Sequence, residues 1–227
     1  MKEKDTIIKT ILSDMERVKE NLLSLSEDIW KSIDHNNPEA LEEGIAFKRE
    51  YNQKVIDFDR LSTEISTLVQ QYTSIRSHSI EIESKDKSSS NEETQRIILE
   101  LNREEPHSVI EDYMYKRPIG FILKDRAFKN IETWKQVLET FCLTLYEIDP
   151  EKFKALPDNP HFISRRGNPT FSRDLHLLRS GLLLRDGIYS EVNLSANSIM
   201  GVIRELMEEY GIKTEEVKIF LRQDRDA

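Results

Sequence analysis

The feature that most constrains this chain is a run of apolar residues spaced three and four apart near its N-terminus. Between residues 8 and 29 this spacing continues through three heptads. A repeat of 3.5 residues keeps one stripe of an α-helix turned toward a partner helix, as in a coiled coil. The candidate interaction seam consists of Ile11, Met15, Val18, Leu22, Leu25 and Ile29. Neighbouring apolar positions widen the stripe, which predicts packing against more than one helix.

A second amphipathic helix is expected from about Pro38 to Ser74. Asn37 can cap its free backbone amides, and proline at the first helical position has no amide to leave unpaired. Because only a short turn separates the two helices, they should lie antiparallel, each offering the other an apolar face. Residues 1–76 are therefore expected to form a coiled-coil-like helical hairpin that binds a protein partner or a second copy of the chain.

Residues 77–93 differ sharply in composition from both flanking regions. Their sequence, SHSIEIESKDKSSSNEE, is dominated by serine and charged residues. Such a segment cannot bury enough apolar surface to offset the entropy lost on ordering. It is predicted to be a flexible linker between the hairpin and a C-terminal domain of residues 94–227. Charged residues make up 33% of the chain, which suits long solvated helices better than one large globule.

The C-terminal domain is expected to be a small α+β domain. Two β-hairpins are predicted, at 118–128 and 182–192, because each contains two short apolar runs separated by a turn sequence. Further elements are predicted from their start and stop signals: a short helix at 94–102, helices after Thr133 and Pro150, a helix reaching Gly211 that Asn193 or Ser195 would cap, and a last strand at 217–221. The order ββα, loop, ββαβ favours α+β over a parallel α/β fold.

Clustered basic residues form a candidate anion-binding or nucleic-acid-binding site within residues 161–185 and just upstream of the first hairpin. The candidates are Lys116, Arg117, Arg165, Arg166, Arg173 and Arg179. Guanidinium groups beside Phe162 and Phe171 could hold phosphates and stack on a base. However, residues 115–227 contain 18 Lys and Arg against 17 Asp and Glu, whereas nucleic-acid binders are commonly basic. The alternative is a solvated loop whose arginines pair with nearby acids.

No catalytic residue, cofactor or metal is expected. The sequence lacks a P-loop, a GxGxxG motif and a GxSxG motif, and its histidines do not have metal-ligand spacing. The single cysteine, Cys142, falls on the apolar face of a predicted helix and is expected to be structural. No apolar run is long enough to cross a membrane. We therefore expect a cytoplasmic protein without membrane contact.

Two segments, KRPIGFILKDRAFKNIETWKQVLETFCLTLYEIDPEKF and GIYSEVNLSANSIMGVIRELMEEYG, carry a resemblance. Residues 117–221 resemble a small α/β accessory module that recurs beside different partners in bacterial proteins, several linked to restriction or phage defence. The resemblance implies an interaction or nucleic-acid-linked module without chemistry of its own.

The favoured interpretation is a non-catalytic adaptor or accessory subunit, which docks through the hairpin and binds a second partner through the α+β domain. The alternative is a nucleic-acid-binding regulator or defence component that uses the loop at 164–173. An enzyme with an unrecognised site is a third possibility, which no sequence motif supports.

Overall fold

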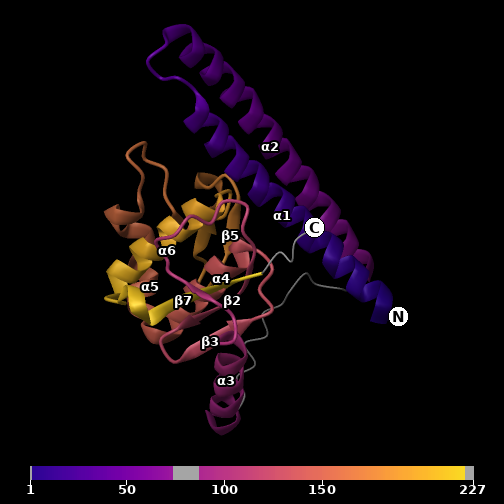
Figure 1. Ribbon diagram of the computed structural model, residues 1–227, viewed down its shortest axis with the longest axis vertical. Coiled ribbons are helices and arrows are strands. Elements are labelled where there is room, and N and C mark those ends of the chain that lie inside the picture. Colours follow the sequence, from indigo (N-terminus) through magenta and orange to yellow (C-terminus); the bar gives the residue numbers. More distant parts are fainter. Residues whose placement is uncertain (1, 74–86, 223–227) are drawn as a thin grey trace. The chain divides into compact units, whose positions relative to one another are not determined.

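The computed structural model describes residues 2–73 and 87–222, and the chain divides into two compact units, residues 1–82 and 83–227 (Figure 1). The division falls within the expected linker, of which residues 77–86 lie outside the described residues. Helix α3 (Lys87–Leu101) begins earlier than predicted, so the expected linker segment 87–93 is helical. The reason is that the C-terminal turns of α3 pack on a sheet, and a helix anchored there can extend by one hydrogen bond per added residue.

The first unit is the expected antiparallel helical hairpin, made of α1 (Lys2–Ser32) and α2 (Pro38–Thr73). Asn37 caps α2 as predicted, because its side-chain oxygen accepts hydrogen bonds from the backbone amides of Glu39 and Ala40, at 3.0 and 3.3 Å. Within this unit the two helices run side by side (Figure 1).

Contacts between α1 and α2 are more polar than the heptad spacing predicts. The Lys19 ammonium lies 2.6 Å from the Asp59 carboxylate. The Tyr51 hydroxyl donates to the Leu22 carbonyl oxygen at 3.0 Å. Farther along, the Lys48 ammonium donates to the Ser26 carbonyl oxygen, also at 3.0 Å. Polar side chains therefore occupy part of the face on which an apolar seam was expected, and α2 does not cover much of the heptad stripe.

The second unit is an α+β domain built on a four-stranded antiparallel sheet with the order β1-β7-β2-β3. The strands are β1 (Pro106–His107), β2 (Pro118–Leu123), β3 (Arg126–Lys129) and β7 (Val217–Leu221). The hairpin β2–β3 and the final strand confirm the sequence-based prediction. The position of β7 between β1 and β2 was not predicted. The two middle strands therefore come from segments almost a hundred residues apart in the sequence.

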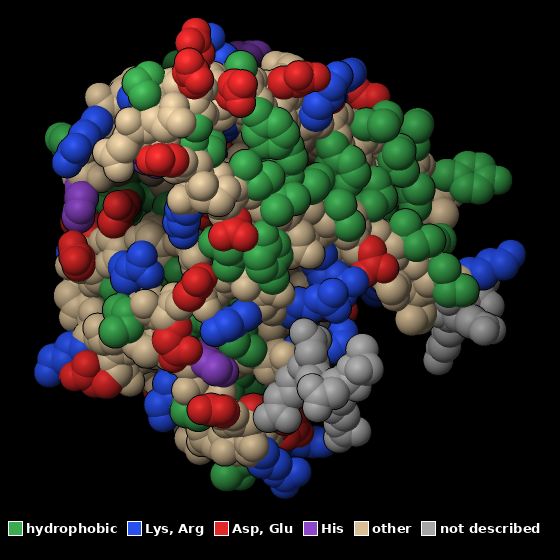
Figure 2. Space-filling view, turned by 45° about the horizontal axis from the view of Figure 1, so that its top comes forward, with side chains coloured by type: hydrophobic (Ala, Val, Ile, Leu, Met, Phe, Trp, Pro, Cys, Tyr) green, Lys and Arg blue, Asp and Glu red, His purple; other side chains and the backbone are tan. Residues whose placement is uncertain are grey.

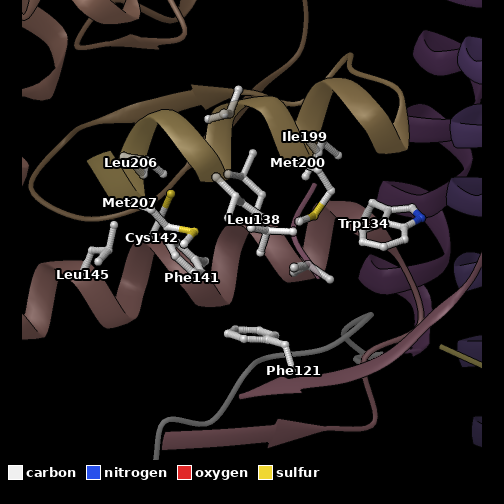
Figure 3. Packing of buried hydrophobic residues seen from close by; sticks show 14 of the residues in the cluster. Phe121, Trp134, Leu138, Phe141, Cys142, Leu145, Ile199, Met200, Leu206 and Met207 are labelled. Atoms are coloured by element: carbon white, nitrogen blue, oxygen red, sulfur yellow. The ribbon is translucent and has the colours of Figure 1, made fainter. Parts of the chain in front are cut away.

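Side chains alternate between the two faces of this sheet, as the pleat of a strand requires. On β2, Phe121 points toward helix α4 (Trp134–Ile148), which packs against helix α6 (Ala196–Tyr210) on its other side (Figure 3). Ile122 points to the opposite face, where it packs with Phe220 and with Leu101 of α3. The sheet is thus covered by helices on both faces, and the main core lies between β2, α4 and α6.

Local signals account for the helix boundaries in this domain. Thr133 caps α4 and forms a capping box with Gln136. Asp149 caps the short helix α5 (Pro150–Ala155). Of the two residues proposed to cap α6, the structure selects Ser195, whose hydroxyl accepts from the Ser198 amide at 3.2 Å. Gly211, with φ 63°, ends α6 in the left-handed conformation that glycine adopts without strain.

A second, three-stranded sheet has the order β4-β6-β5. Its strands are β4 (Phe171–Ser172), β5 (Gly181–Leu183) and β6 (Tyr189–Glu191). The β5–β6 hairpin confirms the prediction made from its turn sequence. Asp186 and Gly187 have φ values of 52° and 71°, which are the positive values that a tight hairpin turn needs.

Candidate interaction surfaces

The predicted seam on α1 is largely exposed rather than packed against α2. Ile11, Val18 and Leu25 are 52%, 46% and 38% exposed. The alternate seam residues Met15, Leu22 and Ile29 are half-buried. The heptad spacing thus identified a real stripe, and the structure places its outermost positions on the surface of the hairpin.

Helix α2 carries a matching exposed stripe. In its C-terminal half, large apolar residues again recur at intervals of four and three, and all are exposed: Leu61, Ile65, Leu68 and Tyr72. Phe47 is exposed near its N-terminus. Leu61 and Phe47 were missed by the sequence reading, although the spacing from Leu61 to Tyr72 is regular enough to have shown this stripe.

The two stripes lie on the same side of the hairpin. On α1, Val18 directly precedes Lys19, which contacts α2, and on α2, Phe47 directly precedes Lys48, which contacts α1. Both helices are right-handed and run antiparallel, so a position one residue before the contact line falls on the same side in each. Figure 2 shows hydrophobic side chains gathered in a broad patch over the part of the molecule that these helices occupy.

We call this surface the apolar face and define it by Ile7, Ile11, Val18, Leu25, Phe47, Leu61, Ile65, Leu68 and Tyr72. Their exposed fractions add up to the equivalent of nearly five fully exposed large side chains. The exposed area of the apolar face is therefore on the order of 900 Å². The largest apolar patch on a typical monomer is about 300–600 Å², and a standard interface buries about 800 Å² per partner. The apolar face therefore has the size of an interface.

The six basic candidates fall into two separate groups. Lys116 and Arg117 directly precede β2, and the Lys116 carbonyl oxygen accepts from the indole nitrogen of Trp134, the first residue of α4, at 2.9 Å. The other four lie in the segment between α5 and β5, in which the Arg173 guanidinium contacts a carbonyl oxygen of α5. No contact among the described residues joins the two groups into one site.

In the second group, Arg173 is engaged within the protein. Its guanidinium lies 2.9 Å from the Asp158 carboxylate and donates to the Lys154 carbonyl oxygen at 2.6 Å. Arg165 and Arg166 are exposed at the tip of a tight loop, which Ser164 and Asn168 close by a backbone hydrogen bond of 2.9 Å. Arg179 is exposed as well. For Arg173 the pairing with a nearby acid, expected as the alternative, is what the structure shows.

The first group lines a cavity of about 410 Å³ together with His107, Tyr115 and Arg222. Sequence reasoning missed His107 and Arg222 as partners of Lys116 and Arg117. Only the pairing of β7 with β1 and β2 brings them together, and that pairing has no local sequence signal.

Cys142 is fully buried in the core between α4 and α6, and burial raises the pKa of its thiol (Figure 3). Among the described residues, no three His, Cys, Asp or Glu side chains lie together in a way that could hold a metal ion. None of the described helices has a stretch apolar enough to span a lipid bilayer.

Comparisons with models of known protein families, with curated protein sequences and with solved structures found no match to this chain. The resemblance of residues 117–221 to a restriction- and defence-linked accessory module therefore stays a prediction from the sequence.

Proposed function

We propose that this protein is a non-catalytic assembly subunit whose helical hairpin pairs with the hairpin of a second copy through the apolar face. The observation that supports this most directly is the heptad-spaced exposure of Ile11, Val18 and Leu25 on α1. A stripe with this period stays in register only with another helix of the same period. The matching stripe on α2 makes the face two helices wide, so that its best complement is another helical hairpin, giving a four-helix arrangement.

A second copy is the favoured occupant because it supplies the required period on both helices and closes by two-fold symmetry. Charge favours one of the two possible orientations. Residues 25–50, at the turn of the hairpin, contain seven acids and three bases, whereas residues 2–24 and 51–73 contain eight acids and seven bases. A head-to-head pair would bring two strongly acidic turns together. An antiparallel pair would place each acidic turn beside a nearly neutral open end, which lowers the repulsion.

In this proposal the α+β domain is carried by the dimer and binds a further partner, as an adaptor would. Dimerisation would place two copies of each binding surface on one particle, which raises the effective concentration for any partner with repeated sites. A role in restriction or phage defence would follow only from the resemblance of residues 117–221 to a defence-linked module.

The test is the mass of the full-length chain in solution, measured by sedimentation or light scattering from about 1 to 100 μM, the range where an interface of this size is expected to act. We expect a dimer. The double variant Ile11→Glu with Val18→Glu should be monomeric with an unchanged helical circular dichroism spectrum. A matched control, Lys9→Glu, makes the same total charge change at an exposed polar residue on another side of the same helix and should remain dimeric. A monomeric wild type, or a dimer that survives the Glu variants, would overturn the proposal.

Orientation can be tested separately by cysteine cross-linking. Lys4→Cys and Asp34→Cys lie near opposite ends of α1. In an antiparallel pair, a mixture of the two variants should cross-link more efficiently than either variant alone. Preferential cross-linking of Asp34→Cys with itself would show the parallel arrangement instead. Cys142 is buried and should not contribute to the reaction.

Nucleic-acid binding through the loop at 164–173 remains a second candidate function. The exposed Arg165 and Arg166 at the loop tip are the observation that favours it. Labelled DNA and RNA should then bind the full chain at low salt, and Arg165→Ala with Arg166→Ala should abolish that binding. Binding that is absent at low salt, or unaffected by the substitutions, would remove this candidate.

A further inference from the structure

The α+β domain contains a cavity of about 410 Å³ at the end of its main sheet, in the size range of small-molecule sites. The cavity lies where β7 and β2 are paired, and its walls come from segments 105–107, 114–117 and 221–222. Two neighbouring segments and a third about a hundred residues later in the sequence thus meet around one hollow.

Positive charge dominates the lining. Lys116, Arg117 and Arg222 border the cavity, and Glu105 is the one carboxylate in its lining. Within residues 87–222, which the structure describes, none of these three cations forms an ion pair, although several other lysines and arginines of the domain do. Three cations against one carboxylate leave the lining with an excess of positive charge, which a bound anion would offset.

Backbone hydrogen bonds fix the positions from which these cationic side chains extend. The Arg222 amide donates to the Arg117 carbonyl oxygen at 2.8 Å, so the two guanidinium groups leave the same end of two paired strands. Lys116 is fixed by the hydrogen bond from the indole of Trp134, a residue that is 1% exposed. Such anchoring allows two planar guanidinium groups and one ammonium to converge on a single anion.

His107 completes this wall from β1. Its Nδ1 lies 2.8 Å from a carboxylate oxygen of Glu111, whose other oxygen accepts from the Ser108 amide at 2.7 Å. Glu111 thus uses its hydrogen bonds on His107 and Ser108, and the Lys116 ammonium acts on it only through a longer-range charge interaction. The imidazole is held in a fixed orientation beside the cavity.

Tyr115 gives the cavity an aromatic wall. It is 45% exposed and has φ 61°, a left-handed conformation that is rare for a bulky side chain. The turn that holds it is fixed on its N-terminal side, where the Tyr113 amide donates to the Asn197 side chain at 2.8 Å and the Tyr113 hydroxyl donates to the Ser108 carbonyl oxygen at 2.6 Å. Local strain of this kind is found where the surrounding structure fixes a side chain for binding.

We infer that this cavity binds the phosphate and base of a single nucleotide, with the phosphate on Lys116, Arg117 and Arg222 and the base against Tyr115. Met114 and Leu221 also line the cavity, and apolar residues of this kind suit a flat, weakly polar ring. A free mononucleotide and the phosphorylated end of a nucleic-acid strand present this same chemistry. The inference does not depend on dimerisation of the hairpin.

Binding should be measured on the full chain by calorimetry at low salt, with AMP, UMP, inorganic phosphate and a short single strand with or without a 5′-phosphate. We expect saturable binding of the mononucleotides, and at least tenfold weaker binding for Arg117→Gln with Arg222→Gln. The matched control, Arg165→Gln with Arg166→Gln, removes the same charge elsewhere and should bind as the wild type does. A circular dichroism spectrum checks that each variant is folded.

Tyr115→Asn tests the base-binding wall, because asparagine tolerates the left-handed conformation and removes the ring. It should weaken AMP binding while leaving inorganic phosphate unchanged. Tighter binding of the 5′-phosphorylated strand than of AMP would identify a strand end as the source, and the reverse would identify a free nucleotide. The inference is overturned by the absence of saturable binding up to about 1 mM ligand. It is equally overturned by equal losses in the two double variants, or by phosphate binding with no preference for nucleotides.

Discussion

The ammonium of Lys19 on α1 lies 2.6 Å from the carboxylate of Asp59 on α2, and the Lys19 side chain is only 3% exposed. An ion pair that is shielded from water is costly to break by removing one partner, because the other charge is left without compensation. Asp59→Asn should therefore lower the free energy of unfolding by about 3 kcal/mol. The measurement is urea denaturation followed by circular dichroism at 222 nm.

An exposed ion pair on the same helix provides the control for this prediction. Arg60 and Glu64 are 3.2 Å apart, and both side chains are more than half exposed. Glu64→Gln should change stability by no more than about 0.5 kcal/mol. Replacing both shielded partners, as Lys19→Met with Asp59→Leu, should recover most of the stability lost in Asp59→Asn. A loss in the double variant as large as in the single one would contradict the ion-pair explanation.

Gly120 is required by the close pairing of β2 with β3. A Cβ atom at this position would overlap the carbonyl oxygen of Phe128, which belongs to the neighbouring strand and cannot move without breaking the pairing. Gly120→Ala should lower the free energy of unfolding by about 2–3 kcal/mol. At Gly201, within α6, an added Cβ would meet only the Arg204 guanidinium, at an ordinary contact distance of 3.8 Å, and Gly201→Ala should raise stability by about 0.5–1 kcal/mol. Thermal denaturation of both variants checks the opposite signs.

Glu111 makes the stability of the α+β domain depend on pH. Its hydrogen bonds with His107 and then with the Ser108 amide hold the pKa of its carboxyl below the ordinary value of 4.5. A carboxyl with a lowered pKa in the folded state stabilises the fold fully above its unfolded pKa, and loses this effect as the pH falls through the folded pKa. Glu111→Gln should therefore lower the melting temperature at pH 7 and have a smaller effect below about pH 4.

The exposed residue Glu215 serves as the control for this pH dependence. The difference in melting temperature between Glu215→Gln and the wild type should stay nearly constant from pH 3 to pH 7, since no described hydrogen bond or ion pair involves the Glu215 side chain. A constant difference for Glu111→Gln across the same range would show that its effect is not one of ionisation.

Cys142 should report on opening of the core. Its thiol is fully buried, and burial raises its pKa, so little thiolate forms and no reagent reaches it in the folded state. The native protein should remain unlabelled by a disulfide reagent at pH 8, whereas the denatured protein should react stoichiometrically. A cysteine at the exposed loop tip, Arg165→Cys, should react at once. Rapid labelling of the native wild type would contradict this prediction and would show that the core opens frequently.

Elements with local signals could be predicted from the sequence. The cap at Thr133, the proline at the start of α5 and the Asp186-Gly187 turn each act over a few residues, and the structure confirms the elements that they predicted. The heptad spacing correctly predicted the hairpin and the stripe that includes Val18. It could not show which side of α1 would face α2, because polar contacts such as that of Lys19 compete with apolar packing in a two-helix unit.

Features that depend on distant segments could not be predicted. No residue near Val217 indicates that β7 will lie between β1 and β2, since strand pairing is decided by the whole sheet. For the same reason, Arg222 could not be associated with Lys116 and Arg117, although these three line one cavity. Conversely, the sequence cluster that joined Lys116 to Arg173 grouped residues that no described contact brings together.

The central position of β7 also means that the main sheet can form only after almost the whole domain has been synthesised. A chain interrupted anywhere before Val217 would have both β1 and β2 without their shared neighbour, and each would expose unpaired backbone amides and carbonyls. Unpaired strand edges are templates for aggregation. Incomplete chains should therefore not form a stable, partly folded domain. They should instead be bound by chaperones or degraded by proteases. Only chains that have been synthesised through β7 would thus form the complete sheet.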